Sequence, residues 1–248
     1  MKITELKKIS LIDYPSKIST ILFTPKCNYK CPTCHAKQIL QNKKELDEKA
    51  IFEYLDFARD FIDGVVICGG EPTREQGLKY FLRKLKDKGL AVKLDTNGSN
   101  YIRLGELKKE GLVKYVAMDV KGPMRLYAKL VGEDFTDERD EVVKAIEVVS
   151  QFPNYEFRTT VVPVTRSKGI SFMTAREIGD TAKLIYESTG DDNHKYFLQG
   201  FIARSKDEMV DEKFAKENLP EKFWETPKKH LEDCLAEAKK YLPNAKIR

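Results

Sequence analysis

The 248-residue chain has few cysteines, little excess charge of either sign and no long apolar run, and each shortage excludes a class of protein. No run of about 18 apolar residues occurs, so we expect no transmembrane helix. The start of the chain, MKITELKKIS, lacks the apolar stretch of a signal peptide, which predicts a cytoplasmic protein whose thiols stay reduced. The five cysteines therefore do not indicate a disulfide framework, and clustered cysteines are better interpreted as ligands or redox groups.

The excess of positive charge is small. The chain has 44 Lys and Arg against 39 Asp and Glu, a formal net charge of +5, and the basic residues are spread along it. A nucleic-acid partner is therefore not indicated, and neither is a membrane partner. Linkers and low-complexity tracts are also missing, so we expect residues 1–248 to form one domain with a short lead-in at 1–17.

The sequence does contain a regular alternation of short apolar runs and amphipathic stretches. Nearly continuous apolar runs are typical of parallel strands that are buried on both faces. Six strands are predicted, at 18–24, 65–69, 91–96, 113–120, 155–163 and 195–201. Six stretches between and after them have apolar residues at helical spacing, which predicts an α/β fold with a parallel sheet. In such sheets, functional side chains gather at the carboxyl ends of the strands.

Helix boundaries are predicted where capping residues occur. Thr73 with Gln76, and Thr174 with Glu177, have the spacing of capping boxes, which predicts the start of a helix at each place. The last helix is expected at about 227–242, behind a threonine and a proline.

Three of the five cysteines, Cys27, Cys31 and Cys34, fall within the stretch KCNYKCPTCH. A structural zinc site needs four Cys or His ligands, and no second pair follows. The residues from Cys31 to His35 match the haem-attachment pattern C-x-x-C-H, but that pattern, like a C-x-x-C redox pair, leaves Cys27 unexplained. A [4Fe–4S] cluster bound by three thiolates uses all three cysteines and leaves one iron open to a substrate or cofactor.

This cysteine spacing directly after the first strand resembles the signature of radical S-adenosylmethionine (SAM) enzymes. The stretch SLIDYPSKISTILFTPKCNYKCPTCH is similar, more narrowly, to the start of the activating proteins of anaerobic ribonucleoside-triphosphate reductase, and the resemblance continues through GGEP, TNG, MDVKGP and FRTTVVP. It implies a single-domain partial (β/α)6 barrel, a [4Fe–4S] cluster on Cys27, Cys31 and Cys34, and SAM as cofactor. Thr33 departs from the family, which usually has an aromatic residue near the adenine, so backbone contacts and other side chains are expected to hold that ring.

The resemblance also implies cofactor-binding residues after the second and third strands. The GGEP segment of the family binds the amino group of SAM, which indicates Gly69, Gly70 and Glu71; the alternative is a simple strand-to-helix turn. The segment LDTNGS has Asp95, Thr96 and Asn97 where family members contact the ribose and carboxylate of SAM, and here the alternative is an Asn-Gly turn.

Polar residues of the later strands complete the predicted site. Asp119 and Lys121 are two residues apart, so both side chains project from one face of a strand. They resemble the Asp-x-Lys element of glycyl-radical activating enzymes, which implies a catalytic role near SAM; a structural ion pair is the alternative. Arg158 lies among apolar neighbours and needs an anionic partner, either the SAM carboxylate or a nearby Asp or Glu. Gln199 is a weaker candidate for SAM binding.

The function that the resemblance implies is reductive cleavage of SAM to a 5′-deoxyadenosyl radical. That radical would remove a hydrogen from a backbone glycine of a glycyl-radical enzyme, the anaerobic reductase, with flavodoxin or ferredoxin as electron donor. With only Cys68 and Cys234 outside the triplet, a second four-cysteine cluster cannot form. Two alternatives stay open: a radical SAM enzyme acting on a tRNA, a peptide or a metabolite, and a zinc-stabilised nucleic-acid-binding module.

Overall fold

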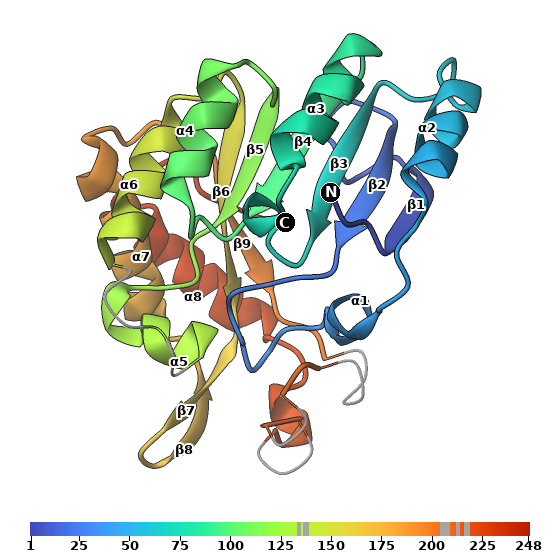
Figure 1. Ribbon diagram of the computed structural model, residues 1–248. Helices are drawn as coiled ribbons and strands as arrows, with labels where there is room; N and C mark the ends of the chain where they lie inside the picture. The colour runs from blue at the N-terminus through green and yellow to red at the C-terminus, as the bar shows by residue number, and fades with distance from the viewer. Residues whose placement is uncertain (133–134, 136–138, 204–208, 212–213, 216–218) are drawn as a thin grey trace.

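The computed structural model describes residues 1–132, 135, 139–203, 209–211, 214–215 and 219–248, and its centre is one eight-stranded sheet (Figure 1). The strand order is β1-β2-β3-β4-β5-β6-β9-β10, and every neighbouring pair is parallel except β1 with β2. Their bounds are β1 Glu5–Ser10, β2 Ser19–Thr24, β3 Gly64–Gly69, β4 Ala91–Thr96, β5 Tyr115–Asp119, β6 Tyr155–Val161, β9 Tyr196–Gly200 and β10 Lys246–Ile247. The six predicted strands correspond to β2, β3, β4, β5, β6 and β9, so the predicted parallel sheet is confirmed.

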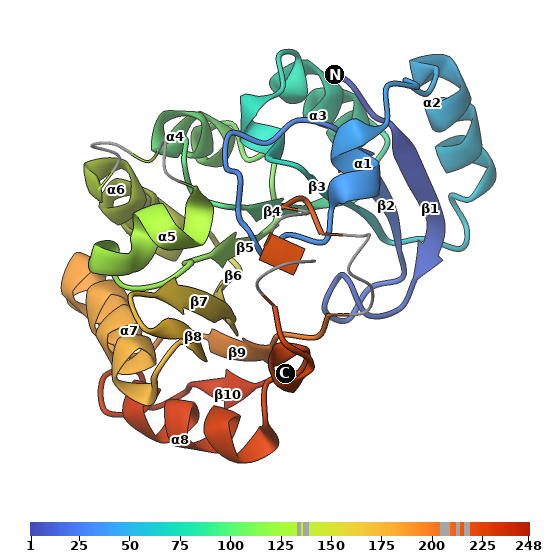
Figure 2. The same cartoon turned by 90° about the horizontal axis from the view of Figure 1, so that it is seen from below.

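Helices alternate with these strands and cover the outer face of the sheet (Figure 1). The sheet curves into a partial (β/α)6 barrel, and Figure 2 views it from the side on which the strands end, which we call the mouth. Two short helices, α1 Lys37–Gln41 and α5 Tyr127–Val131, lie on that side. The longer helices are α2 Glu48–Phe57, α3 Leu78–Asp87, α4 Tyr101–Lys109, α6 Arg139–Ser150, α7 Ala175–Thr189 and α8 Lys228–Ala238.

Four strands and two helix boundaries differ from the sequence predictions; one of these boundaries is the end of the last helix, expected at about 242 and found at Ala238. β1 and β10 extend the sheet at its two ends, and β7 Pro163–Arg166 with β8 Gly169–Phe172 forms a separate antiparallel hairpin at the mouth. The capping box at Thr73 was wrong: Thr73 lies in a 3-10 turn, Pro72–Arg74, and α3 begins only at Leu78, behind the left-handed Gly77. The second capping box, Thr174 with Glu177, is confirmed at the start of α7.

The inner face of the sheet has two layers. A small apolar cluster fills the amino end of the barrel and consists of Tyr14, Ile21, Val66, Tyr115 and Ala117. Because side chains alternate between the two faces of a strand, Asp119 lies on the same face as Tyr115 and Ala117, nearer the mouth. The apolar layer therefore closes one end of the barrel, and polar side chains line the other.

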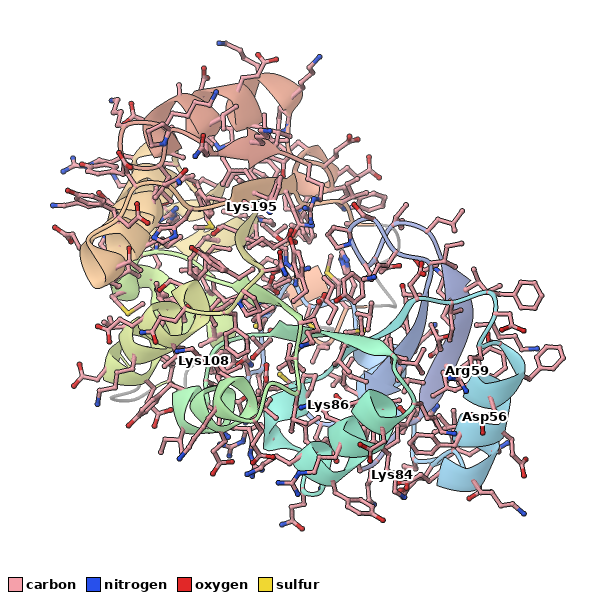
Figure 3. The ribbon with its side chains drawn as sticks, turned by 90° about the horizontal axis from the view of Figure 1, so that it is seen from above. Asp56, Arg59, Lys84, Lys86, Lys108 and Lys195 are labelled. Atoms are coloured by element: carbon pink, nitrogen blue, oxygen red, sulfur yellow. The ribbon has the colours of Figure 1, made fainter. Side chains whose placement is uncertain are left out.

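Lysines join the outer helices to one another. Viewed from the end opposite the mouth, Lys84 and Lys86 lie on α3 and Lys108 on α4 (Figure 3). Lys84 Nζ is 2.6 Å from Glu48 Oε1 on α2, and Lys86 Nζ donates to the Glu110 carbonyl at 3.0 Å after α4. Exposed pairs of this kind contribute little to stability, so apolar packing rather than these lysine contacts determines the fold. No helix in the part of the chain that the structure describes is long and apolar enough to span a membrane.

Candidate active site

The three clustered cysteines lie on the loop that follows β2, at the mouth of the barrel. Their side chains are partly buried and form no disulfide, and the Cys34 amide donates to the Cys31 carbonyl at 3.0 Å. A cavity of about 450 Å³ opens beside this loop. That volume lies within the usual range for small-molecule and cofactor sites. Its lining brings together Cys31, Thr33, Cys34, His35, Asp119, Lys121, Arg158, Thr160 and Phe201, among others.

The donor set fits an iron–sulfur cluster better than a single metal ion. Among the described residues, no three His, Cys, Asp or Glu side chains come together as ligands of one ion, as a mononuclear zinc site would need. In a [4Fe–4S] cluster the three thiolates would each bind a different iron. Cys31 and Cys34 line the cavity, whereas Cys27 is not among the described residues that line it. Burial raises the pKa of the Cys31 thiol to about 12, and the Lys121 ammonium opposes that rise. A positive charge therefore lies where thiolates would form.

Gly69 and Gly70 allow the chain to turn tightly against the start of the cysteine loop. The Gly70 amide donates to the Thr24 carbonyl at 2.8 Å, and the Glu71 amide to the Lys26 carbonyl at 2.5 Å. A Cβ atom on Gly70 would lie 2.0 Å from the Lys26 oxygen, and Gly69 has a φ of +105°. The close approach made possible by these glycines is thus to the protein's own cysteine loop.

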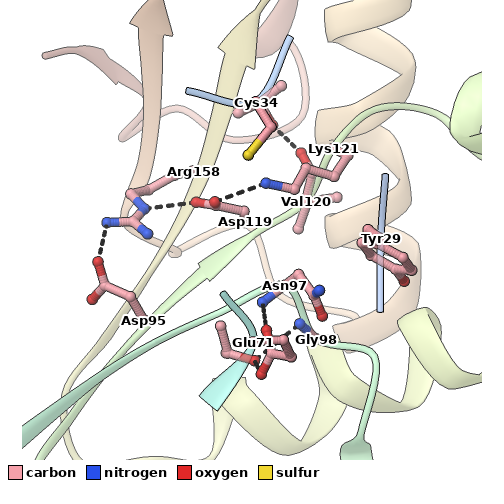
Figure 4. A network of polar contacts seen from close by, with 12 residues as sticks. Tyr29, Cys34, Glu71, Asp95, Asn97, Gly98, Asp119, Val120, Lys121 and Arg158 are labelled. Carbon is pink, nitrogen blue, oxygen red and sulfur yellow. Dashed lines mark hydrogen bonds and ion pairs between the residues drawn. The ribbon is translucent and has the colours of Figure 1, made fainter. Parts of the chain in front are cut away.

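The Glu71 carboxylate is fully buried and is used within the chain. Its Oε1 accepts from the Thr73 amide at 3.0 Å and from the Thr96 hydroxyl at 2.8 Å, while its Oε2 accepts from the Asn97 amide at 2.6 Å. Burial raises the pKa of Glu71, and these hydrogen bonds oppose the rise. Figure 4 shows the Glu71 carboxylate beside the Asn97–Gly98 turn. Glu71 therefore joins the turn after β3 to the turn after β4.

Asn97 extends this network to the cysteines. Its Nδ2 donates to Asn28 Oδ1 at 3.1 Å and lies 3.8 Å from Cys27 Sγ, and its Oδ1 accepts from the Ser99 amide at 2.9 Å. Asn28 and Ser99 were not singled out from the sequence. Nothing in their spacing indicates the contact, because they are 71 residues apart and meet only through the fold.

Four charged side chains alternate in sign in one row, and three of them, Arg158, Asp119 and Lys121, line the cavity (Figure 4). Arg158 Nε donates to Asp119 Oδ1 at 2.8 Å, and its NH1 donates to Asp95 Oδ2 at 3.0 Å. Lys121 Nζ completes the row, 2.9 Å from Asp119 Oδ2. Two kinds of anionic partner were predicted for Arg158, the SAM carboxylate or a nearby Asp or Glu, and in the structure Arg158 pairs with nearby Asp residues. Asp119 and Lys121 meet on one face, as their spacing predicts, and both line the cavity.

Charge and burial act in opposite directions on this row. Burial alone would raise the pKa of Asp119, but Arg158 and Lys121 outweigh it and hold that pKa below its usual range. Burial would lower the pKa of Lys121, but Asp119 and the Cys31 thiol raise it. Both groups are therefore charged near neutral pH, and the cavity has fixed charges of both signs.

The remaining predicted residue and several unpredicted ones lie around this wall. Gln199 is the register partner of Thr160 on β6 and is not among the described residues that line the cavity. The buried Tyr127 hydroxyl accepts from the Lys121 amide at 3.1 Å. The rings of His35 and Phe201 face each other in the cavity with centroids 5.3 Å apart. Phe201 could have been found from its place directly after β9, whereas no spacing indicates Tyr127.

Comparison with known proteins identifies the family to which the chain belongs. The family model of the radical SAM superfamily matches residues 21–168, more than half of the chain. A Methanocaldococcus jannaschii protein named "Putative glycyl-radical enzyme activating enzyme" is 35% identical over 245 residues, which cover 97% of this chain and 92% of that protein. A Pyrococcus abyssi protein named "Probable GTP 3′,8-cyclase" is 29% identical over 130 residues, 51% of this chain and 41% of the relative.

Solved structures agree on the fold. Streptococcus suis SuiB bound to S-adenosylmethionine superposes with a TM-score of 0.53 at 16% identity, over 92% of this chain and 49% of SuiB. At that identity the likeness establishes the fold alone, and the chain spans about half the length of SuiB. Together with the family match and the M. jannaschii relative, these findings lead to one conclusion: the chain belongs to the radical SAM superfamily.

Proposed function

We propose that this radical SAM enzyme installs a glycyl radical on a partner enzyme, an anaerobic ribonucleoside-triphosphate reductase. The observation that carries the proposal is the cavity in which Cys31 and Cys34 meet the Asp119–Lys121 pair. The M. jannaschii relative, which is similar over nearly its whole length and is named as a glycyl-radical enzyme activating enzyme of putative status, supports this target.

The residues present fit the cofactors that the family implies. We propose that Cys27, Cys31 and Cys34 would hold a [4Fe–4S] cluster and that the adjoining cavity would hold SAM. When bound, the cluster and SAM supply one-electron cleavage of SAM to methionine and a 5′-deoxyadenosyl radical. SAM carries a carboxylate, an ammonium and a sulfonium, and a wall with fixed charges of both signs suits such a ligand.

In the proposal, Lys121 and Asp119 are the catalytic residues because they present charge to the cavity beside the cysteines. Arg158 acts through Asp119, to which it donates a hydrogen bond. The other proposed cofactor-binding residues divide into two groups. Gly69, Gly70, Glu71, Thr96 and Asn97 shape the turns behind the cysteine loop, and Gln199 remains a candidate on β9.

A polypeptide loop is the proposed substrate, since the barrel is open. The sheet begins at β1 and ends at β10, and these two strands are not paired with each other. A glycine-bearing loop could therefore approach the cavity from the mouth. We propose flavodoxin or ferredoxin as the donor of the single electron.

The proposal is tested by incubating the reconstituted enzyme with SAM, a reductant and the cognate anaerobic reductase. We expect a glycine-centred radical on the partner, detected as a doublet by electron paramagnetic resonance. As a control, replacing the acceptor glycine of the partner with alanine should abolish the doublet. SAM cleavage accompanied by modification of a tRNA, a peptide or a small molecule, with no radical on any glycyl-radical partner, would contradict the proposed target.

A further inference from the structure

All polar atoms of the Asn97 side chain are engaged within the chain. Asn97 is 7% exposed, its Nδ2 donates to Asn28 and approaches Cys27, and its Oδ1 accepts from Ser99. The backbone N–H of Asn97 also donates a hydrogen bond, to Glu71 Oε2. Both donor hydrogens of the Asn97 side chain are therefore directed at partners within the chain rather than at a ligand in the cavity, and its contact with the Cys27 sulfur, 3.8 Å from Nδ2, needs another explanation.

Hydrogen bonds to a sulfur ligand favour the more negative state of an iron–sulfur cluster. Reduction adds one electron to the cluster, and N–H dipoles aimed at a thiolate stabilise that added charge. The described residues supply three such contacts. The Tyr29 amide is 3.4 Å from Cys27 Sγ, the Ala36 amide is 3.5 Å from Cys34 Sγ, and Asn97 Nδ2 is the contact made by a side chain.

We propose that Asn97 is a positioning residue for the cluster: it fixes Cys27 and, through its N–H group, raises the reduction potential of the bound cluster. The inference rests on the proposed cluster site and not on the proposed polypeptide target. Because Asn97 acts on a sulfur ligand, its effect is present without SAM.

The buried network behind Asn97 explains why the amide is held in this orientation. Glu71 anchors the Asn97 backbone at 2.6 Å, and Ser99 anchors the side-chain oxygen at 2.9 Å, which leaves the NH₂ group facing the cysteine loop. Asn28, one residue after Cys27, accepts from both Asn97 and the Ser99 hydroxyl, each at 3.1 Å. The turn after β4 is thus attached to the loop at the residue next to the ligand.

The test is a redox titration of the reconstituted protein with dithionite, followed by electron paramagnetic resonance in the absence of SAM. Asn97→Leu removes the N–H group, and we expect a more negative midpoint potential. Asn97→Asp keeps the size of the side chain and the acceptor for Ser99 but adds negative charge, so its potential should shift further in the same direction. Iron release to a ferrous chelator should also be faster in both variants, since Cys27 is less firmly held.

Asn100→Ser is the matched control. Asn100 caps α4 through the Arg103 amide and donates to the Thr73 carbonyl, and none of its hydrogen bonds involves a cysteine. Serine keeps the helix cap, so the midpoint potential should equal that of the wild type. Unchanged potentials in cluster-loaded Asn97→Leu and Asn97→Asp would overturn the inference while the proposed function stands. A shift that appears only with SAM bound would overturn it as well, because Asn97 would then act through SAM. A wild-type protein that binds no cluster would contradict both the inference about Asn97 and the proposed function.

Discussion

Asp119 accepts hydrogen bonds from two cations, Arg158 and Lys121, through different carboxylate oxygens. A buried charge that loses its partner is costly, so the effect of a substitution depends on what remains. Without Lys121, Asp119 keeps Arg158, and without Asp119, Arg158 keeps Asp95. Removal of Asp119 also takes the carboxylate from Lys121, but the Lys121 side chain is 28% exposed at the cavity, where water can solvate it. The row therefore tolerates the loss of either member of the Asp-x-Lys pair better than a fully buried, isolated ion pair would.

We expect Lys121→Ala and Asp119→Ala to impair reaction more than folding. Formation of 5′-deoxyadenosine should fall about tenfold or more, which corresponds to roughly 1.4 kcal/mol of lost transition-state stabilisation. Thermal unfolding and iron content should remain close to those of the wild type.

Lys114→Ala is the matched control for this pair. Lys114 is an exposed lysine directly before the same strand, at the end opposite the mouth, and its replacement should change none of these quantities. If the Asp119 and Lys121 variants unfold but keep normal activity per folded chain, the pair is a structural salt bridge.

Among the elements, the turn after β3 packs directly against the start of the cysteine loop. Gly70 approaches the Lys26 carbonyl so closely that a methyl group cannot be added without moving one of the two segments. We therefore expect Gly70→Ala to lower both the free energy of unfolding and the iron bound per chain after reconstitution.

Gly105→Ala provides the comparison. Gly105 is within α4, and a Cβ there would have no heavy atom within 4 Å, so alanine should raise the free energy of unfolding by about 0.5–1 kcal/mol. Chemical denaturation of both variants, with iron analysis, measures the two effects. A Gly70→Ala protein with wild-type stability and iron content would contradict the role assigned to this turn.

The central strands could be predicted because they are apolar on both faces, and the other strands could not. β1, with the sequence ELKKIS, is largely exposed and rich in lysine, so it lacks the apolar run by which the others were found. In the β7–β8 hairpin the strands are four residues each and the first begins with a proline. The failed capping box at Thr73 has a different cause: its hydroxyl donates to Glu71, which caps the short turn instead.

For the molecule as a whole, segments far apart in the sequence meet at one end of the sheet. The cysteine loop, the turns after β3 and β4, the end of β5 and the middle of β6 all contribute to the site or to its support. The rule that function gathers at the carboxyl ends of parallel strands predicts this meeting. It cannot predict pairings, such as Arg158 with Asp95 or Asn97 with Cys27, because these depend on distances between strands.

The central claim, that the three-cysteine loop holds a cluster that cleaves SAM, is tested most directly by product analysis of anaerobically reconstituted protein. With dithionite and SAM, the wild type should bind about four iron and four sulfide per chain and form 5′-deoxyadenosine and methionine. Cys27→Ala, Cys31→Ala and Cys34→Ala should lose both cluster and product, while Cys68→Ala and Cys234→Ala should keep them. One zinc without sulfide, or S-adenosylhomocysteine as the sole product, would contradict the account.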